Sequence, residues 1–161
     1  MNKQNSKRII YLILDNIRSV HNVGSIFRTA ETIGVSKIYC VGTTPTPVDR
    51  FNRKRSDFAK VALGAEDLVS WEYSSRPVAL VKRLKKEGFE IIALEQADKA
   101  VDYKKVKVNR KTAVILGNEV GGVSKLLLKL ADIIAEIPLK GKKESLNVSV
   151  AAGISLFTFF E

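Results

Sequence analysis

The stretch from Ile137 to Phe157, IPLKGKKESLNVSVAAGISLF, is the one around which we interpret the rest of the chain. A short apolar segment closed by Pro138 leads into a basic Gly–Lys loop and then into an uncharged run, residues 148–160. Asn147 is a good helix N-cap for that run, because its side-chain oxygen can accept hydrogen bonds from the first turn. A loop that ends in a capped, buried helix is a rigid place to hold a ligand, although a surface loop before a core helix has the same pattern.

The composition indicates one basic globular domain. The 161 residues are enough for a single domain with a full core and too few for two ordinary domains. The hydrophobic fraction of 45% and the charged fraction of 27% are typical of globular proteins. The net charge of +10 favours a polyanionic partner. Nucleic acid is the first candidate partner. An anionic membrane surface is the second, but no strongly basic amphipathic helix in the sequence supports it. A merely basic soluble protein remains an alternative.

The cysteine count and the apolar runs indicate the compartment. The single cysteine, Cys40, cannot form an internal disulfide and has no Cys/His neighbours for a zinc site. The apolar run at residues 9–14 is too short for a signal-peptide core. The run at 148–160 falls short of the roughly 20 residues that span a bilayer. We therefore expect a cytoplasmic protein with no membrane partner and no metal.

Strands and helices alternate along the chain, which predicts an α/β fold with a mainly parallel sheet covered by helices on both faces. Apolar runs predict strands at residues 9–14, 37–41, 89–94, 112–116 and 133–137. Helices are expected at residues 22–33, 75–87, 124–131 and 148–160, with Asn22, Ser75, Ser124 and Asn147 as N-caps and Gly34 and Gly88 as terminators. Residues 42–60 are expected to be irregular, 98–109 to form a charged connection, and 68–71 to suit a short strand. In such sheets, ligands bind beyond the carboxyl ends of the strands.

The first loop of interest is HNVGSIFR, residues 21–28. Arg28 lies roughly opposite the buried side of the predicted helix and offers a charged planar fork. Gly24, one turn earlier, leaves room for a phosphate or another backbone to come close. A solvated surface arginine has the same pattern. The only histidine, His21, is expected to make a structural hydrogen bond rather than to act as a base.

The second loop, LGNEVGGVS at residues 116–124, lies between a strand and a helix, where a phosphate loop would be. Val123 occupies the position of the essential lysine in G-x-x-x-x-G-K-[ST], which excludes a P-loop NTPase. A Rossmann G-x-G-x-x-G pattern is also absent. What remains is a glycine turn with Glu119 at its tip, which suits a cationic group, a hydroxyl donor or an arginine. The third loop, residues 145–147, adds neutral donors and acceptors but no metal-ligand spacing and no catalytic triad.

Three stretches in this order, NVGSIFRTA (22–30), GNEVGGVS (117–124) and IPLKGKKESLNVSVA (137–151), resemble the signature motifs of the SpoU (TrmH) class of SPOUT RNA methyltransferases. The resemblance runs from about Asp15 to the C-terminus and includes ALGAED (62–67). It implies one methyltransferase domain over residues 1–161, with no separate RNA-binding domain. It also implies a C-terminal deep trefoil knot, a homodimer, and S-adenosylmethionine as methyl donor. The acceptor would be a ribose 2′-hydroxyl of tRNA or rRNA.

The resemblance also implies site residues. Arg28 matches the arginine that acts at the ribose and its adjacent phosphate, and Asn22 matches the asparagine beside it. The implied catalytic residues are Arg28, Asn22, Glu119, Asn147 and Ser145. The implied cofactor-binding residues are Leu94, Gly117, Asn118, Glu119, Gly121, Ile137, Leu139, Ser145, Leu146 and Asn147.

Methyl transfer from a sulfonium needs an oriented acceptor oxygen, in-line geometry and a place for the proton, but no metal and no covalent nucleophile. Because arginine stays protonated in proteins, we expect Arg28 to assist electrostatically rather than as a base. Residues 50–60 are expected to grip RNA through phosphate contacts and through stacking of Phe51 and Phe58 on bases. A solvated loop with one or both phenylalanines in the core is the alternative. The expected RNA-binding residues are Arg28, Arg50, Arg53, Lys54 and Arg55.

Two other functions stay open. One is a non-catalytic RNA-binding or ribosome-assembly module of the same fold, against which the intact Arg28, Glu119 and Asn147 argue. The other is a small-molecule enzyme of this fold, which the net charge of +10 disfavours. The helix expected at 148–160 is apolar nearly all round and must be buried, so we also expect a second subunit to cover it.

Overall fold

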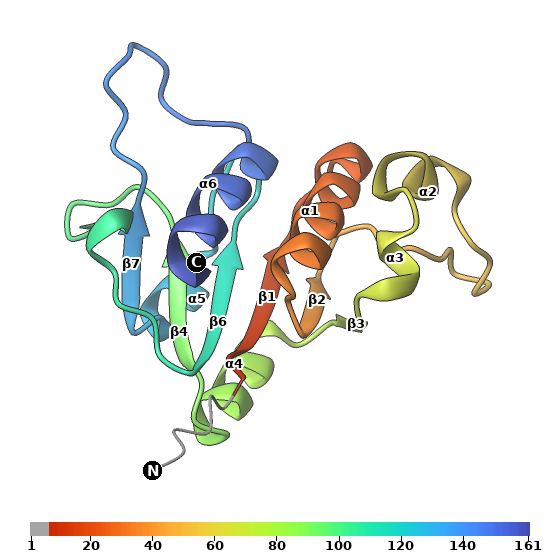
Figure 1. Cartoon of the computed structure of the whole chain (residues 1–161), viewed down its shortest axis with the longest axis horizontal. Helices are drawn as coiled ribbons and strands as arrows, with labels where there is room; N and C mark the ends of the chain where they lie inside the picture. Colours follow the sequence, from red (N-terminus) through yellow and green to blue (C-terminus); the bar gives the residue numbers. More distant parts are fainter. Residues whose placement is uncertain (1–6) are drawn as a thin grey trace.

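The computed structural model describes residues 7–161, and the predicted apolar strands form the centre of one sheet (Figure 1). Its order is β3-β2-β1-β6-β4-β7-β5, and every neighbouring pair is parallel. The bounds are β1 (Ile9–Asp15), β2 (Lys37–Val41), β3 (Trp71–Ser74), β4 (Glu90–Leu94), β5 (Val101–Asp102), β6 (Lys111–Leu116) and β7 (Ile133–Glu136). The predicted α/β fold with a parallel sheet is confirmed.

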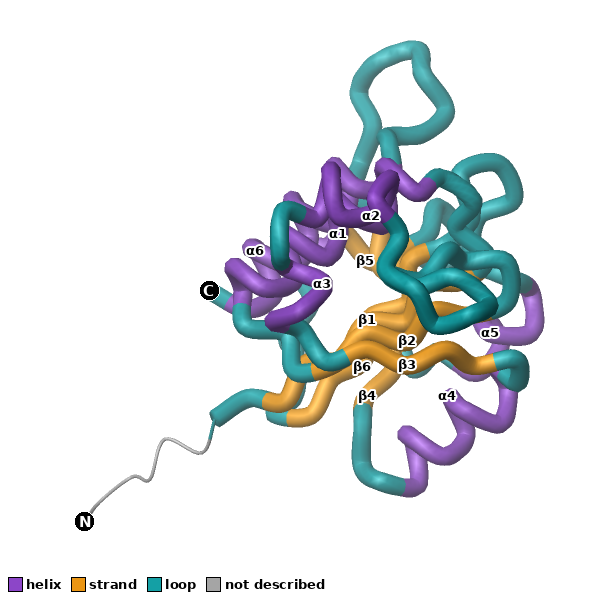
Figure 2. Tube along the Cα trace, turned by 90° about the vertical axis from the view of Figure 1, so that its right-hand side faces the viewer, coloured by secondary structure: helices purple, strands orange, loops and turns teal. Residues whose placement is uncertain are grey.

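The helices form one layer on each face of the sheet (Figure 2). On one side lie α1 (Val20–Ile33), α2 (Ser56–Ala62), α3 (Ala65–Leu68) and α6 (Val148–Phe160). On the other side lie α4 (Pro77–Lys86) and α5 (Lys125–Leu130). Because successive side chains of a strand point to opposite faces, Leu12 and Leu14 of β1 join the first core and Ile13 joins the second.

The strand order determines which loops meet. β6 lies between β1 and β4, in register from Ile9 opposite Lys111 to Leu14 opposite Leu116. Since all strands run in the same direction, the loops after β1, β4, β6 and β7 emerge at one edge of the sheet, where ligands bind in such folds. The trefoil knot implied by the resemblance concerns the threading of the chain rather than the strand order, and it stays a prediction.

Helix α1 starts earlier than predicted, and Asn22 is not its cap. Ser19 occupies the N-cap position, and its Oγ accepts a hydrogen bond from the backbone N–H of Asn22 at 3.1 Å. Serine and asparagine cap helices about equally well, so propensity alone does not separate them. The C-terminal prediction is confirmed, because Gly34 adopts the left-handed conformation with φ 84°.

The predicted cap of one other helix, α4, is also incorrect. In α4, Arg76 rather than Ser75 occupies the N-cap position and makes no side-chain cap bond, while Pro77 starts the helix. Ser124 lies at the predicted N-cap of α5, but its side chain makes no cap bond. Its backbone N–H instead donates to Asp15 Oδ2 at 2.8 Å.

Short elements account for the remaining differences. The stretch expected to be irregular, 42–60, contains the start of α2. In the stretch expected to suit a short strand, 68–71, Leu68 ends α3 and only Trp71 belongs to a strand, as the first residue of β3. The charged connection at 98–109 contains β5 and a 3-10 turn, Tyr103–Lys105. Elements of two to seven residues have too few positions to show a clear period.

Several features of residues 7–161 bear on membrane crossing, metal binding and cysteine chemistry. Within this range, no helix is both long and apolar enough to cross a membrane. The same residues hold no group of three or more His, Cys, Asp or Glu side chains placed to bind a metal ion. Cys40 is buried, and burial raises the pKa of its thiol to about 12, so it is not a thiolate at neutral pH.

Phe58 and Phe51 form a matched pair for testing this packing. Phe58 is fully buried, with its ring edge-on to Phe27 at 5.1 Å between centroids, whereas Phe51 is 62% exposed. We expect Phe58→Ala to lower the free energy of unfolding by about 3–5 kcal/mol, because it leaves a cavity. Phe51→Ala should change it by less than about 0.5 kcal/mol. Urea denaturation measures both, and equal losses would contradict the packing.

Candidate active site

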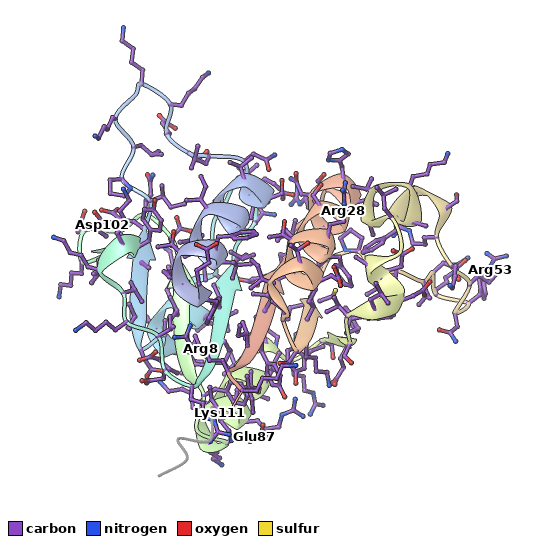
Figure 3. The ribbon with its side chains drawn as sticks, in the orientation of Figure 1. Arg8, Arg28, Arg53, Glu87, Asp102 and Lys111 are labelled. Atoms are coloured by element: carbon purple, nitrogen blue, oxygen red, sulfur yellow. The ribbon has the colours of Figure 1, made fainter. Side chains whose placement is uncertain are left out.

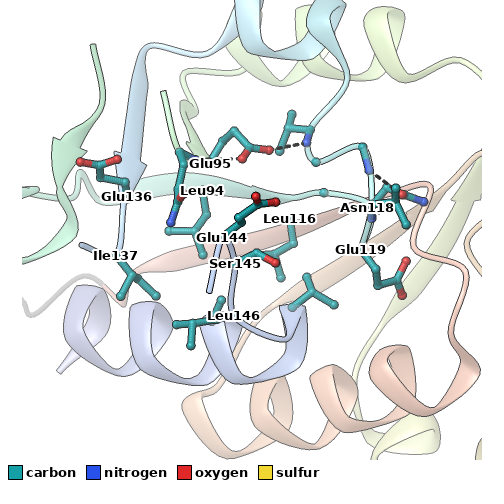
Figure 4. A pocket seen from close by; sticks show the side chains of 18 of the residues that line it. Leu94, Glu95, Leu116, Asn118, Glu119, Glu136, Ile137, Glu144, Ser145 and Leu146 are labelled. Carbon is teal, nitrogen blue, oxygen red and sulfur yellow. Dashed lines mark hydrogen bonds between the residues drawn. The ribbon is translucent and has the colours of Figure 1, made fainter. Parts of the chain in front are cut away.

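A cleft of about 510 Å³ opens at the carboxyl ends of β4, β6 and β7. This volume lies in the range of small-molecule pockets. Its walls are the end of β4, the glycine turn after β6, and the loop from β7 into α6. Figure 4 shows Glu136 and Ile137 at one end of the cleft and Asn118 and Glu119 at the other.

The glycine turn, residues 117–122, has little conformational freedom. Asn118 and Gly122 exchange both backbone hydrogen bonds, at 3.0 and 2.9 Å. A Cβ on Gly117 would lie 2.2 Å from the backbone nitrogen of Val123, and Gly122 has φ 67°. Both positions therefore require glycine, for close approach in one case and backbone conformation in the other.

Carboxylate and amide side chains tie this turn to the sheet. Glu95, directly after β4, accepts the Val123 N–H at 2.8 Å. Asn118 Nδ2 donates to the backbone oxygen of Asn16 at 2.6 Å, next to the end of β1. Together with the bond from Ser124 to Asp15, these contacts hold the turn against β1 and β4.

Glu119, at the tip of the turn, holds the loop between β1 and α1. Its Oε1 accepts hydrogen bonds from the Ser19 backbone and from Asn22 Nδ2, each at 3.1 Å. Its Oε2 accepts the Arg18 N–H at 3.1 Å. Burial opposes ionisation of the Glu119 carboxyl, but these donors, the Arg18 N–H foremost, outweigh burial and hold its pKa below its usual value.

Asn22 connects Glu119 to the third motif. Its Oδ1 accepts a hydrogen bond from Asn147 Nδ2 at 3.1 Å. Asn147 in turn accepts from Ser149 N–H at 2.9 Å and from Val150 N–H at 3.4 Å, so it caps α6 as predicted. We call this chain of side chains, Glu119–Asn22–Asn147, the relay. It joins all three motifs.

The structure gathers the predicted cofactor residues around the cleft. All of them line it except Asn147, which reaches it through the relay. Glu95, Glu136 and Glu144 also line the cleft and were not predicted. The position of Glu95 beyond β4 and of Glu136 at the end of β7 is the signal that would have identified two of them.

Arg28 is not brought to the cleft of its own chain. It is exposed on α1 and is not among the residues that line the cleft (Figure 3). Gly24, one turn earlier, faces α2, because a Cβ there would lie 2.9 Å from Val61 Cβ. The open space that the sequence predicted at Gly24 is therefore filled by another part of the backbone rather than left for a phosphate.

The cations predicted to bind RNA are mostly paired with carboxylates. Salt bridges join Arg53 to Asp49 at 2.8 Å, Lys54 to Asp67 at 2.9 Å, and Arg55 to Asp57 at 2.7 Å. Arg50 lies over the exposed Phe51 ring at 4.8 Å. Since Phe58 is in the core, Phe51 is the phenylalanine of this stretch that can stack on a base.

The comparisons with known proteins agree with this arrangement of motifs. Residues 9–157 match the SpoU rRNA Methylase family. The 23S rRNA (guanosine-2'-O-)-methyltransferase of Nitrosomonas europaea is 34% identical over 151 residues, which cover 94% of this chain and 55% of that protein. The tRNA (guanosine(18)-2'-O)-methyltransferase of Aquifex aeolicus is 30% identical over 148 residues, 92% of this chain and 67% of that protein.

A solved structure extends the likeness to three dimensions. An AdoMet-bound rRNA methyltransferase from Sinorhizobium meliloti superposes with a TM-score of 0.84 at 27% identity, over 98% of this chain and 57% of that one. This chain spans 55% and 67% of the two curated relatives just described. The family match covers nearly all of the described residues and includes the three motifs that the relay joins. The chain therefore belongs to the SpoU rRNA methylase family.

Proposed function

We propose that this protein transfers a methyl group from S-adenosylmethionine to a ribose 2′-hydroxyl of tRNA or rRNA in the cytoplasm. The observation that carries the proposal is the relay, because it fixes three motif loops around one cleft. The similar 23S rRNA and tRNA enzymes, both guanosine 2′-O-methyltransferases, support the substrate class.

The chemistry of the cleft suits this methyl donor. Apolar walls can pack against an adenine ring, and carboxylates can accept hydrogen bonds from ribose hydroxyls and favour a positive charge. When bound, S-adenosylmethionine supplies a methyl group that its sulfonium already activates. The apolar contacts would come from Leu94, Leu116, Ile137, Leu139 and Leu146, and the carboxylates from Glu95, Glu136 and Glu144.

The relay residues are assigned to positioning. Glu119 is an acceptor for three N–H donors and is held ionised, so it fixes the β1–α1 loop and does not donate a proton. Asn22 and Asn147 fix the loop that carries Ser145 beside the cleft. Arg28 is assigned to the acceptor: its fixed positive charge would lower the pKa of the ribose hydroxyl and stabilise the developing oxyanion.

We further propose a homodimer in which Arg28 serves the cleft of the partner. Val150, Ile154 and Phe157 lie on one side of α6 and are 50%, 37% and 41% exposed. A second copy that covers this stripe also comes close to α1, because α1 packs against α6. Arg28 lies outside the cleft of its own chain, and this supports a site completed by two subunits.

We also propose that residues 50–55 contact RNA near this site. Arg50 and the exposed Phe51 are directly available for a phosphate and a base. Arg53, Lys54 and Arg55 would exchange their carboxylate partners for phosphates. That exchange is feasible because an exposed salt bridge contributes only about 0–1 kcal/mol.

Arg28→Ala tests the assignment of the acceptor arginine. We expect calorimetric titration to show S-adenosylmethionine binding to the wild-type protein and to the variant with the same affinity. Methyl transfer to RNA should fall by about 10²–10³-fold in the variant, the usual cost of losing one oxyanion donor. An equal loss of cofactor affinity would show that Arg28 acts elsewhere. A wild-type protein that binds RNA but no cofactor would be a non-catalytic module.

Complementation tests the shared site. Arg28→Ala and Asn147→Ala are each expected to be inactive when expressed alone. Co-expressed with different affinity tags, they should form mixed dimers in which one cleft has both residues intact. Random pairing would then restore about a quarter of the wild-type sites. No recovery in purified mixed dimers would place Arg28 in its own chain, and a stable monomer at micromolar concentration in sedimentation would exclude the dimer.

Glu119→Gln tests the relay through pH. The pKa of Glu119 is lowered in the folded protein, so its ionised form stabilises the fold at neutral pH, and this contribution is lost as pH falls below the ordinary value of 4.5. We expect the variant to unfold with about 1–2 kcal/mol less free energy at pH 7. The difference from wild type should shrink on acidification. A difference independent of pH would mean that the carboxylate charge does not hold the loop.

A further inference from the structure

The positive charge is distributed unevenly between the two helix layers. Helix α4 contains four basic residues and α5 contains two, and neither contains an acid. The helices of the opposite layer contain two basic residues against four acids: Arg28 and Lys60, and Glu31, Asp57, Glu66 and Asp67. The excess positive charge of the helices therefore lies on the α4–α5 side of the sheet, which Figure 2 shows apart from the other layer.

Four lysines of this layer are available to a partner. Lys82, Lys86, Lys125 and Lys129 are exposed, and none of them takes part in a salt bridge within the described residues. Lys85 is occupied, because its Nζ bonds to the Leu130 backbone oxygen at 2.8 Å and to Asp132 at 2.7 Å. This contact joins the ends of α4 and α5. We call Lys82, Lys86, Lys125 and Lys129 the lysine face.

The lysine face starts at the cleft. Lys125 lines the cleft, and Lys129 follows it by one helical turn, about 6 Å along α5. Because α5 leads from the end of β6 to the start of β7, it runs from the cleft edge of the sheet toward the opposite edge. Lys82 and Lys86 extend the positive surface onto α4, which packs against α5.

We propose that the lysine face binds the phosphate backbone of RNA outside the cleft, an inference that rests on the proposed function. Lysine–phosphate contacts are independent of sequence and position the RNA, while the cleft receives the ribose. An anionic membrane fits this face poorly. Helix α4 has already buried Leu80, Val81 and Leu84 against the sheet. The exposed Leu126 of α5 is a single large apolar side chain on this face, whereas an inserting helix presents a continuous apolar side.

The test is the triple variant Lys82→Gln, Lys86→Gln and Lys129→Gln. Lys125 is left unchanged because it lines the cleft, and glutamine keeps a similar helix propensity. Binding of unfractionated tRNA is measured by filter retention between about 50 and 200 mM KCl. We expect affinity at the lowest salt to fall about tenfold or more, and the log–log salt slope to flatten by about 2, as three lost phosphate contacts predict. The thermal unfolding midpoint and the S-adenosylmethionine affinity should not change.

A matched control removes the same charge elsewhere. Lys104→Gln, Lys105→Gln and Lys107→Gln alter three exposed lysines of the Tyr103–Lys105 turn and the residues after it, which contacts α6 in the other layer. We expect this variant to keep the wild-type salt slope. Equal weakening in both variants would overturn the proposal in favour of net charge, and no weakening in the first variant would overturn it outright.

Two further readouts separate the possible explanations. If the first variant loses binding to phosphatidylglycerol vesicles but keeps RNA binding, the face is a membrane site and the proposal fails. The tRNA measurement needs neither cofactor nor methyl transfer. If the wild-type protein proves to have no methyl-transfer activity, loss of RNA binding in the triple variant still supports the lysine face. If the triple variant keeps both methyl transfer and normal RNA binding, the lysine face is refuted and the proposed function stands.

Discussion

The site depends on one partly buried carboxylate, Glu119. Three of the six residues in the turn at 117–122 are glycines, so the side chains of Asn118 and Glu119 hold the neighbouring loop. Glu119 accepts three N–H groups from residues about a hundred positions earlier in the chain. Bonds to an ionised acceptor are roughly twice as strong as neutral ones, which suits an anchor at the rim of a solvent-exposed cleft.

The chemistry of the anchor determines which residues can follow it in the relay. Asn22 must donate to Glu119 and accept from Asn147. An aspartate at position 22 would place a second carboxylate against Glu119, and a leucine could neither donate nor accept a hydrogen bond. Asn147 is likewise both a donor and an acceptor, since it donates to Asn22 and accepts from the first turn of α6. The relay thus runs in one direction, from the positive end of a helix dipole to a carboxylate.

The strands and the side chains of the cleft differ in how well the sequence alone predicts them. The central strands are covered on both faces, so runs such as residues 9–14 are continuously apolar and easy to recognise, whereas β5 and α3 are too short to show a period. The sequence predicts Asn22 as a helix cap because N-cap preferences depend on neighbouring residues alone, whereas its hydrogen-bond partner is the distant Glu119. Glu95 and Glu136 were missed because an acid at a strand end resembles any solvated loop residue. The motif resemblance, which compares whole loops, identified nine of the residues that line the cleft.

The charges of the cleft and of the outer surface are opposite, and this bears on how RNA would approach. Four glutamates, Glu95, Glu119, Glu136 and Glu144, line the cleft beside a single lysine, Lys125, in a protein of net charge +10. In the proposed reaction, the carboxylates favour a cationic donor and repel phosphates, whereas the lysines of α4 and α5 attract them. The RNA backbone would then be held at the rim of the cleft and kept out of it. Such a division would let the protein bind a polyanion on its outer surface and still keep the proposed cofactor site free of it.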